Sequence, residues 1–268
     1  MPKANHQTPE SVPPMPEPSR PGIAPNRGAL VADSVVVHFG SVAALRGASL
    51  SVGAGECVAL VGESGSGKTT LLRCFNALVH PRSGSVSVRG QSLPGVDPVQ
   101  VRRSMGYIPQ SGGLLPHWSV GRNAALVLKL LGRSDAIQVA NATLDRVGLP
   151  HAKFADRWPR SLSGGQRQRV ALARALASDP DIVLMDEPLG ALDALARAEL
   201  RGVIADLIRE SEATVLLVTH DLHEAVTLAD RIAVMRGGRV LQIDSLDRLR
   251  AAPADPYVTD LLDRGLAR

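Results

Sequence analysis

Aromatic residues, cysteines and long apolar runs are all scarce in this sequence of 268 residues. Aromatic side chains make up 3% of the chain, and its two cysteines are Cys57 and Cys74. Two cysteines give no disulfide framework, so we expect buried, reduced thiols in a cytosolic setting. No apolar run reaches the roughly 20 residues that cross a bilayer as a helix, and the first residues lack the apolar core of a signal peptide. Any role at a membrane is therefore expected to require a partner.

A large excess of charge of one sign is also missing. The formal net charge is +4, and the arginines are spread through expected helices rather than gathered in one block. This distribution does not indicate nucleic-acid binding. The apolar content of 44% is ample for the core of one large domain or two small ones.

The first 28 residues differ in composition from the rest. They hold eight of the 19 prolines and scarcely any large apolar side chain. Such a segment cannot bury enough surface to fold. We therefore expect a disordered tail over residues 1–28.

The remainder alternates strand and helix patterns, which is typical of an α/β fold with a mainly parallel sheet. Short β-rich runs broken by Gly and Ser predict a small antiparallel layer, and fully apolar runs predict buried strands. Antiparallel strands are expected at 34–37, 48–52 and 85–88, buried strands at 57–61, 182–185 and 214–219, and a hairpin at 231–235 and 239–243.

Helical periodicity is clearest after the first buried strand and in the middle of the chain. Residues 68–79 place Leu71, Leu72, Phe75, Leu78 and Val79 on one face of an expected helix. Residues 111–170 carry few strand signals, which predicts a helical subdomain inserted into the α/β core. Helices are expected at 120–131, 134–147 and 195–210.

Residues 62–69 read Gly-Glu-Ser-Gly-Ser-Gly-Lys-Thr and match the phosphate-binding loop (P-loop) pattern G-x-x-x-x-G-K-[ST]. The loop lies between a buried strand and a helix, as its mechanism requires: glycines let backbone N–H groups surround the phosphates, Lys68 reaches the β- and γ-oxygens, and Thr69 offers its hydroxyl to Mg²⁺. A chance glycine-rich loop is the alternative. The residues expected to bind nucleotide here are Gly62, Glu63, Ser64, Gly65, Ser66, Gly67, Lys68, Thr69 and Thr70.

A second candidate for chemistry is the acidic pair that ends the apolar run at 182–185. A parallel strand directs its carboxyl end toward the P-loop, so Asp186 can hold the Mg²⁺ shell. Glu187, one residue further, can polarise an attacking water as a general base. A lone Asp-Glu pair is more often a solvated turn, but the apolar run and the P-loop favour the catalytic interpretation.

The third feature is Leu-Ser-Gly-Gly-Gln at residues 162–166, which lies between the P-loop and the acidic pair. Ser163 is a natural N-cap for a helix that begins near Gln166, and exposed N–H groups at a helix start receive anions. An ordinary capped helix is the alternative. Together with the other two motifs, this segment resembles the signature of the ATP-binding cassette (ABC) family, and the resemblance covers residues 30–262.

The resemblance implies a P-loop NTPase (RecA-like) core with a small antiparallel β layer and an inserted α-helical subdomain. It places the ATP-binding domain at 29–250, with the helical subdomain at about 111–170, and a C-terminal extension at 251–268. It also implies that ATP is bound with Mg²⁺ between two cassettes arranged head to tail. The residues expected to contact the partner's ATP are Ser163, Gly164, Gly165 and Gln166.

The resemblance gives roles to four further residues that carry little signal alone. His220 would bond the γ-phosphate and link it to Glu187, although a lone His is more often structural. Gln110 matches the family glutamine that reaches Mg²⁺ and the attacking water. Asp193 matches a loop that crosses to the partner subunit, with a helix cap as the alternative. Phe39 matches the aromatic residue under adenine, with core packing as the alternative.

Three functional classes remain open for a single cassette without membrane helices. The first is the ATP-hydrolysing subunit of an importer, which would dock on separate permease subunits and work with a solute-binding protein at the cytoplasmic face of the inner membrane. The second is a non-transport ATPase acting on ribosomes or DNA. The third is a partner in mechanotransmission or lipoprotein release. One P-loop, one signature and a compact subdomain favour the first class over the second.

Local stretches outside the ATP site resemble importers of quaternary amines such as glycine betaine, choline and carnitine. Residues 105–117 resemble their segment around Gln110, with a coupling helix of the permease expected near residues 111–118, and residues 253–258 resemble their segment after the cassette. Importers of amino acids, sulfonates or phosphonates share the same cassette and remain alternatives. Many of the amine importers continue into paired CBS domains, whereas the sequence ends at Arg268, which puts regulation of that kind in doubt.

Overall fold

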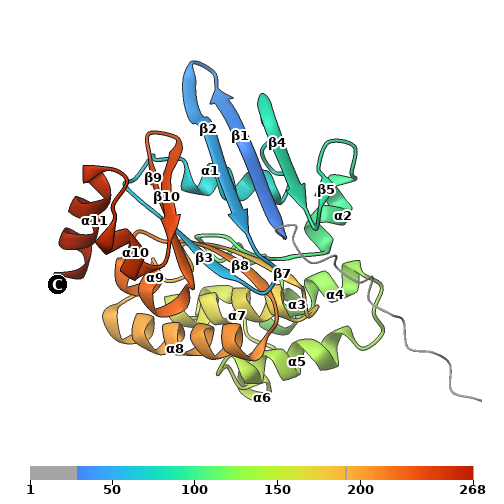
Figure 1. The fold of residues 1–268 in the computed structure, drawn as a ribbon. Helices are drawn as coiled ribbons and strands as arrows, with labels where there is room; N and C mark the ends of the chain where they lie inside the picture. The colour runs from blue at the N-terminus through green and yellow to red at the C-terminus, as the bar shows by residue number, and fades with distance from the viewer. Residues whose placement is uncertain (1–28, 191, 268) are drawn as a thin grey trace, which may run out of the picture.

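The computed structural model describes residues 29–190 and 192–267, which fold into two sheets and surrounding helices (Figure 1). The tail predicted over residues 1–28 lies outside these described residues. The smaller sheet has the order β2-β1-β4-β5, and all its pairings are antiparallel. Its strands are β1 (Leu30–Phe39), β2 (Val42–Val52), β4 (Ser83–Val88) and β5 (Gln91–Ser92).

The larger sheet has the order β10-β9-β3-β8-β7-β6 and forms the centre of the molecule. Five of its strands run parallel, and β10 pairs with β9 as an antiparallel hairpin. This arrangement of sheets and helices confirms the α/β class expected from the strand patterns. The strands are β3 (Cys57–Val61), β6 (Gly106–Ile108), β7 (Ile182–Asp186), β8 (Thr214–Val218), β9 (Arg231–Arg236) and β10 (Arg239–Asp244).

The helices cover both faces of the larger sheet (Figure 1). Those from α3 to α7, with a short 3-10 turn at Pro159–Ser161, form a helical layer below the sheet in that view. The helices are α1 (Lys68–Phe75), α2 (Pro98–Arg103), α3 (Val120–Ala124), α4 (Leu126–Leu130), α5 (Ala136–Arg146), α6 (His151–Phe154), α7 (Gly164–Leu176), α8 (Ala194–Glu210), α9 (Leu222–Leu228), α10 (Leu246–Ala251) and α11 (Pro256–Leu266).

Alternation along the strands of the larger sheet divides the buried side chains into two cores. In β3, Val58 and Leu60 face one core, while Ala59 and Val61 face the other. The first core contains α1 and the smaller sheet, so α1 lies between the two sheets. The second core contains α8 and the helical layer from α3 to α7. The helices that carry the P-loop lysine and the signature therefore lie on opposite faces of one sheet.

Two helix predictions need correction. The helix expected over 68–79 ends at Phe75, because Ala77 adopts a left-handed φ of 53° and the N–H of Leu78 returns to the Arg73 carbonyl. Leu78, predicted on the buried face, is 49% exposed. The helix expected over 120–131 is divided at Ala125 into α3 and α4. Strand β6 was not predicted, since three residues are too few for a period-two signal.

Within residues 29–190 and 192–267, no helix is both long enough and apolar enough to span a membrane. Both cysteines are free and buried, as expected. Burial raises the pKa of each thiol to about 12, so neither is a reactive thiolate.

Candidate functional site

The P-loop follows β3 and runs directly into α1, and its backbone is tightly enclosed. A Cβ on Gly62 would lie 2.1 Å from the Met235 carbonyl oxygen, and one on Gly67 would lie 2.7 Å from the carbonyl oxygen of Ala44. Both glycines have positive φ, 146° and 102°, which side chains disfavour. The loop is also bonded to the β9–β10 turn, because Gly238 N–H donates to the Ser66 carbonyl at 3.0 Å. No other residue type fits at these two glycines.

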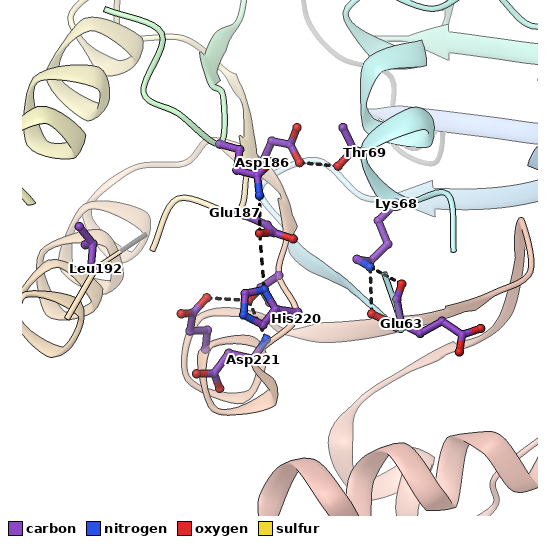
Figure 2. Close-up of polar contacts among 12 residues, drawn as sticks. Glu63, Lys68, Thr69, Asp186, Glu187, Leu192, His220 and Asp221 are labelled. Carbon is purple, nitrogen blue, oxygen red and sulfur yellow. Dashed lines mark hydrogen bonds and ion pairs between the residues drawn. The ribbon is translucent and has the colours of Figure 1, made fainter. Parts of the chain in front are cut away.

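Lys68 is buried beneath this loop (Figure 2). Its Nζ donates to the carbonyl oxygens of Gly62 at 2.9 Å and Glu63 at 2.8 Å. Burial lowers the pKa of the ammonium, and the nearby carboxylates of Glu187 and Asp186 oppose that change. The ammonium is thus held by two backbone oxygens, which phosphate oxygens could replace.

Thr69 and Asp186 form the candidate metal site. The Thr69 hydroxyl donates to Asp186 Oδ1 at 2.7 Å, joining the start of α1 to the end of β7 (Figure 2). Burial raises the pKa of Asp186, and its bonds from Thr69 and Arg73 partly offset this effect. The described residues hold no cluster of three or more His, Cys, Asp or Glu suited to a metal. A hydroxyl and one carboxylate still fit Mg²⁺, which commonly takes a few protein oxygens together with phosphate and water.

Arg73 was not among the residues predicted for this site. It lies one helical turn after Thr69 on α1, and its guanidinium is 3.5 Å from Asp186 Oδ2. The (i, i+4) spacing from Thr69 was a signal that could have identified it.

Two other predicted site residues, Gln110 and His220, contact Glu187. Its Oε2 accepts a hydrogen bond from Gln110 Nε2 at 2.8 Å and lies 3.5 Å from His220 Nδ1. These residues follow β7, β6 and β8, whose carboxyl ends share one edge of the sheet. The Glu187 side chain is 21% exposed and that of His220 is 58% exposed, so water can reach both. A carboxylate in this position can orient and polarise a water molecule.

The backbone at Glu187 is in the left-handed region, with φ of 48°. Its N–H donates to the Val218 carbonyl at 2.9 Å, which holds the residue against the end of β8. Non-glycine residues rarely adopt this conformation and often do so at functional sites. The strain places the carboxylate beyond the strand end.

The turn that carries His220 is held by a buried carboxyl that sequence analysis missed. Thr219 Oγ1 donates to Glu224 Oε2 at 2.6 Å and accepts from the N–H of Asp221 at 3.0 Å. Burial raises the pKa of Glu224. The Thr219 side chain and the start of α9 thus form one bonded unit around His220.

The signature residues form an N-terminal cap whose first residue, Ser163, is exposed. Ser163 Oγ accepts from the N–H of Gln166, and the Gln166 side chain accepts from the N–H of Ser163, which is a capping box. No hydrogen bond among the described residues joins 163–166 to loop 62–69. Gly164 opens α7, and a Cβ on Gly165 would lie 3.4 Å from the Ala196 side chain. The cap therefore presents N–H groups that its own P-loop does not use.

The body of α7 holds the loop that carries Gln110. Gln168 Nε2 donates to the Gln110 carbonyl at 3.3 Å, and Arg174 donates to the carbonyls of Gly112 and Gly113, both at 2.7 Å. Arg174 is buried, so these contacts satisfy a charge that would otherwise be costly. The helix that begins with the signature is therefore bonded to the loop that reaches Glu187.

Two weaker predictions can be placed. Asp193 caps α8, with its Oδ1 accepting from the N–H of Ala196 at 2.9 Å, and the residue is exposed. Phe39 is 55% exposed at the end of β1, so the core-packing alternative is wrong for this residue. Val42, across the same turn, is 65% exposed, and the two offer an apolar surface.

Comparison with known proteins places these features in a family context. The family model described as ABC transporter matches residues 45–190. The osmoprotectant import ATP-binding protein OsmV of Salmonella typhimurium is 42% identical over 82% of this chain and 59% of the relative. The carnitine transport ATP-binding protein OpuCA of Listeria monocytogenes is 40% identical over 85% of this chain and 57% of the relative.

Other matches extend the comparison to iron import and to a solved structure. The Fe(3+) ions import ATP-binding protein FbpC 1 of Rhodococcus jostii is 44% identical over 85% of this chain and 65% of the relative. The chain thus spans less than two thirds of the length of these three relatives. A dimeric structure of the ATP-binding cassette MJ0796, bound to ADP and Pi, has a TM-score of 0.74 and 32% identity, covering 81% of this chain and 98% of the other.

Because the Asp186 carboxylate is buried, we expect that removing its charge makes the folded protein more stable. Because its pKa is raised in the fold, the folded state holds the proton more tightly, and stability is lost as pH rises through that pKa. Asp186→Asn should therefore raise Tm at pH 7 by on the order of 2–4 °C, and the gain should shrink toward pH 4. Scanning calorimetry without nucleotide or Mg²⁺ measures this, with the exposed Asp263→Asn as control. A lower Tm for Asp186→Asn at pH 7 would show that the bonds from Thr69 and Arg73 outweigh burial.

Proposed function

Because the chain belongs to the ABC transporter family, we propose that it is the ATP-binding, ATP-hydrolysing subunit of an importer. The observation that carries the proposal is the meeting of Gln110 and His220 at Glu187, beside the Thr69–Asp186 pair. This arrangement provides a base, a hydrogen-bonding partner on each side of it and an oxygen site for a metal. Hydrolysis of a phosphoanhydride needs these parts and little covalent chemistry from the protein.

In the proposed reaction, the P-loop and Lys68 bind the phosphates and Glu187 receives a proton from the attacking water. Mg²⁺, held by Thr69 and Asp186 with Gln110 close by, would neutralise charge on the phosphate oxygens. Gln110 and His220 keep the Glu187 carboxylate in place, and His220 is exposed enough to contact the γ-phosphate. The exposed ring of Phe39 would lie against adenine, which suits its position at a strand end.

We further propose that two copies assemble head to tail. The capping box at Ser163 leaves N–H groups of α7 free to receive an anion, and no hydrogen bond among residues 29–190 and 192–267 links them to the chain's own P-loop. A γ-phosphate held by the partner's P-loop is the anion that fits. Asp193, exposed at the start of α8, would lie at the same interface. ATP would then favour the closed dimer, and its hydrolysis would reopen it.

The proposed partners in the membrane are permease subunits, together with a solute-binding protein, which places the chain peripherally at the cytoplasmic face of the inner membrane. A rigid, exposed segment supports this. The buried side chain of Asn123 donates to the carbonyls of Leu115, Trp118 and Ser119 and accepts from the N–H of Leu115. The turn at Pro116 and His117 is thereby held at the surface, where a permease helix could dock.

The proposed solute is a quaternary amine of the glycine betaine, choline or carnitine type. The support is the likeness at residues 105–117 and 253–258, and the names of two relatives, which refer to osmoprotectant and carnitine transport. The relative named for Fe(3+) import, at 44% identity, favours ferric ion as a second candidate. The solute would contact the partners rather than this chain, so the choice between the two is tested by uptake rather than by the cassette.

Glu187→Gln should reduce ATP turnover by at least about 100-fold while preserving ATP binding, because it removes the base and keeps the shape of the side chain. Phosphate release by the purified protein and binding of a fluorescent ATP analogue measure the two effects. Glu212→Gln, an exposed carboxylate outside the site, is the matched control. Turnover near that of the wild type would remove Glu187 from the role of base.

Ser163→Arg should abolish ATP-dependent dimerisation and leave ATP binding by the monomer within about twofold, since the cap is proposed to act on the partner's nucleotide. Size-exclusion chromatography with ATP, in the Glu187→Gln background, gives the oligomeric state. Ser134→Arg introduces the same charge at an exposed position elsewhere in the helical layer. An unchanged dimer peak for Ser163→Arg would contradict the shared site.

Deletion of the gene should abolish uptake of labelled glycine betaine or choline, and restoring it should return uptake. Expression of the Glu187→Gln variant instead of the wild type should not restore it. Uptake of labelled ferric ion in the same strains is the comparison that matters. Loss of iron uptake with normal amine uptake would overturn the solute assignment and leave the importer proposal standing.

A further inference from the structure

The C-terminal helix α11 is bonded directly to the P-loop. The Tyr257 hydroxyl accepts a hydrogen bond from the backbone N–H of Glu63 at 3.0 Å, across 194 residues of sequence. Glu63 is the first residue after Gly62, and positions 63–65 of the loop are exposed. The contact therefore holds the loop at the end where it leaves β3, away from the amides nearer α1.

Arg236, at the end of β9, completes a three-residue cluster with Tyr257 and Glu63. Its guanidinium lies 4.6 Å from the centre of the Tyr257 ring, and its Nε is 4.0 Å from Glu63 Oε1. A cation over an aromatic face is attractive and fixes the ring plane. We call these three residues the C-terminal brace. They come from the P-loop, a strand of the central sheet and the last helix.

The helix that carries Tyr257 is itself firmly anchored. Asp255 caps α11 through the N–H of Tyr257 at 2.8 Å, and Val258 and Leu262 are buried in the core beside α9. At the far end, a Cβ on Gly265 would lie 2.3 Å from the Leu222 side chain, so the two helices touch there. Leu222 begins α9, two residues after His220. The helix thus contacts both the P-loop and the segment that follows the His220 turn.

We propose that Tyr257 is a positioning residue of the nucleotide site, which keeps the P-loop in the conformation that receives phosphate. This inference rests on the proposed function. The Glu63 amide lies near the exposed start of the P-loop. The other amides of this loop are proposed to face the same phosphate ligand at the same time. Without the hydroxyl, that amide bonds to water and the loop gains conformations that binding must remove. Within residues 29–190 and 192–267, no hydrogen bond or ion pair joins Tyr257 to Glu187 or His220, so its effect is expected to fall on ATP affinity before turnover.

Tyr257→Phe is the first test, because it removes the hydroxyl and keeps the ring beneath Arg236. The full-length variant should bind a non-hydrolysable ATP analogue with a Kd about two- to tenfold higher, and KM for ATP should rise by more than kcat falls. Thr259→Val removes a hydroxyl from an exposed position of the same helix and should leave both unchanged. An unchanged Kd for Tyr257→Phe would overturn the proposal.

Hydrogen exchange of the nucleotide-free protein is the second test and does not depend on hydrolysis. The peptide that contains Glu63 should exchange faster in Tyr257→Phe than in the wild type or Thr259→Val, while α1 stays protected. Faster exchange with unchanged affinity would show a brace without a positioning role and would overturn the proposal. A wild-type protein that fails to bind ATP would instead contradict the proposed function, whatever the exchange of the variant.

Discussion

Parallel pairing of β3, β8 and β7 is the constraint on which the site depends. The register brings the carboxyl ends of the strands level, and bonds continue past the strands: Thr219 N–H donates to the Leu60 carbonyl at 3.1 Å, and Glu187 N–H to the Val218 carbonyl at 2.9 Å. Three loops from distant parts of the sequence are thereby aligned at one edge. A shift of one residue in the β7–β8 pairing would move the side chains of one strand to the opposite face of the sheet and separate Glu187 from His220.

The site concentrates opposite charges in a place where water is limited. Lys68 and Asp186 are both buried, and burial moves the pKa of each toward its neutral form. The hydrogen bond from Thr69 opposes that tendency at Asp186, and the carboxylates of Glu187 and Asp186 oppose it at Lys68. Buried charges of this kind stabilise the fold less than apolar side chains of the same size would. A bound phosphate anion and its metal ion would pair with Lys68 and Asp186 and so stabilise the site. The site without nucleotide is therefore expected to be a local weak point that nucleotide binding stabilises.

Much of the fold and of the site could be predicted because the signals are local. The apolar runs that became β3, β7 and β8 are short and uninterrupted, and the P-loop is a contiguous pattern. The end of α1 could not be predicted, because Leu78 fits helical periodicity and only the left-handed turn at Ala77 removes it from the helix. Strand β6 depends on its neighbour β7 rather than on its own three residues.

Contacts between distant segments were missed for a different reason. Tyr257 and Glu63 are joined by one hydroxyl and one backbone amide, and neither group stands out in a sequence. The bonds from Gln168 and Arg174 to the Gln110 loop likewise end on carbonyl oxygens, which every residue possesses. When a side chain bonds to a backbone group, its partner can be any residue type, so the sequence contains no pair of residues that would reveal the contact.

The position of α1 between two sheets has a mechanical consequence. Its buried side chains pack between the two sheets, and the loop before it packs closely against β2 and is hydrogen-bonded to the β9–β10 turn and to α11. The helical layer is attached differently, through one face of the central sheet and the loop at Gln110. Under the proposed function, the P-loop would stay fixed and the layer from α3 to α7 would be the part that moves. Force from a docked partner would be delivered through α7, with the phosphates held still against the sheet.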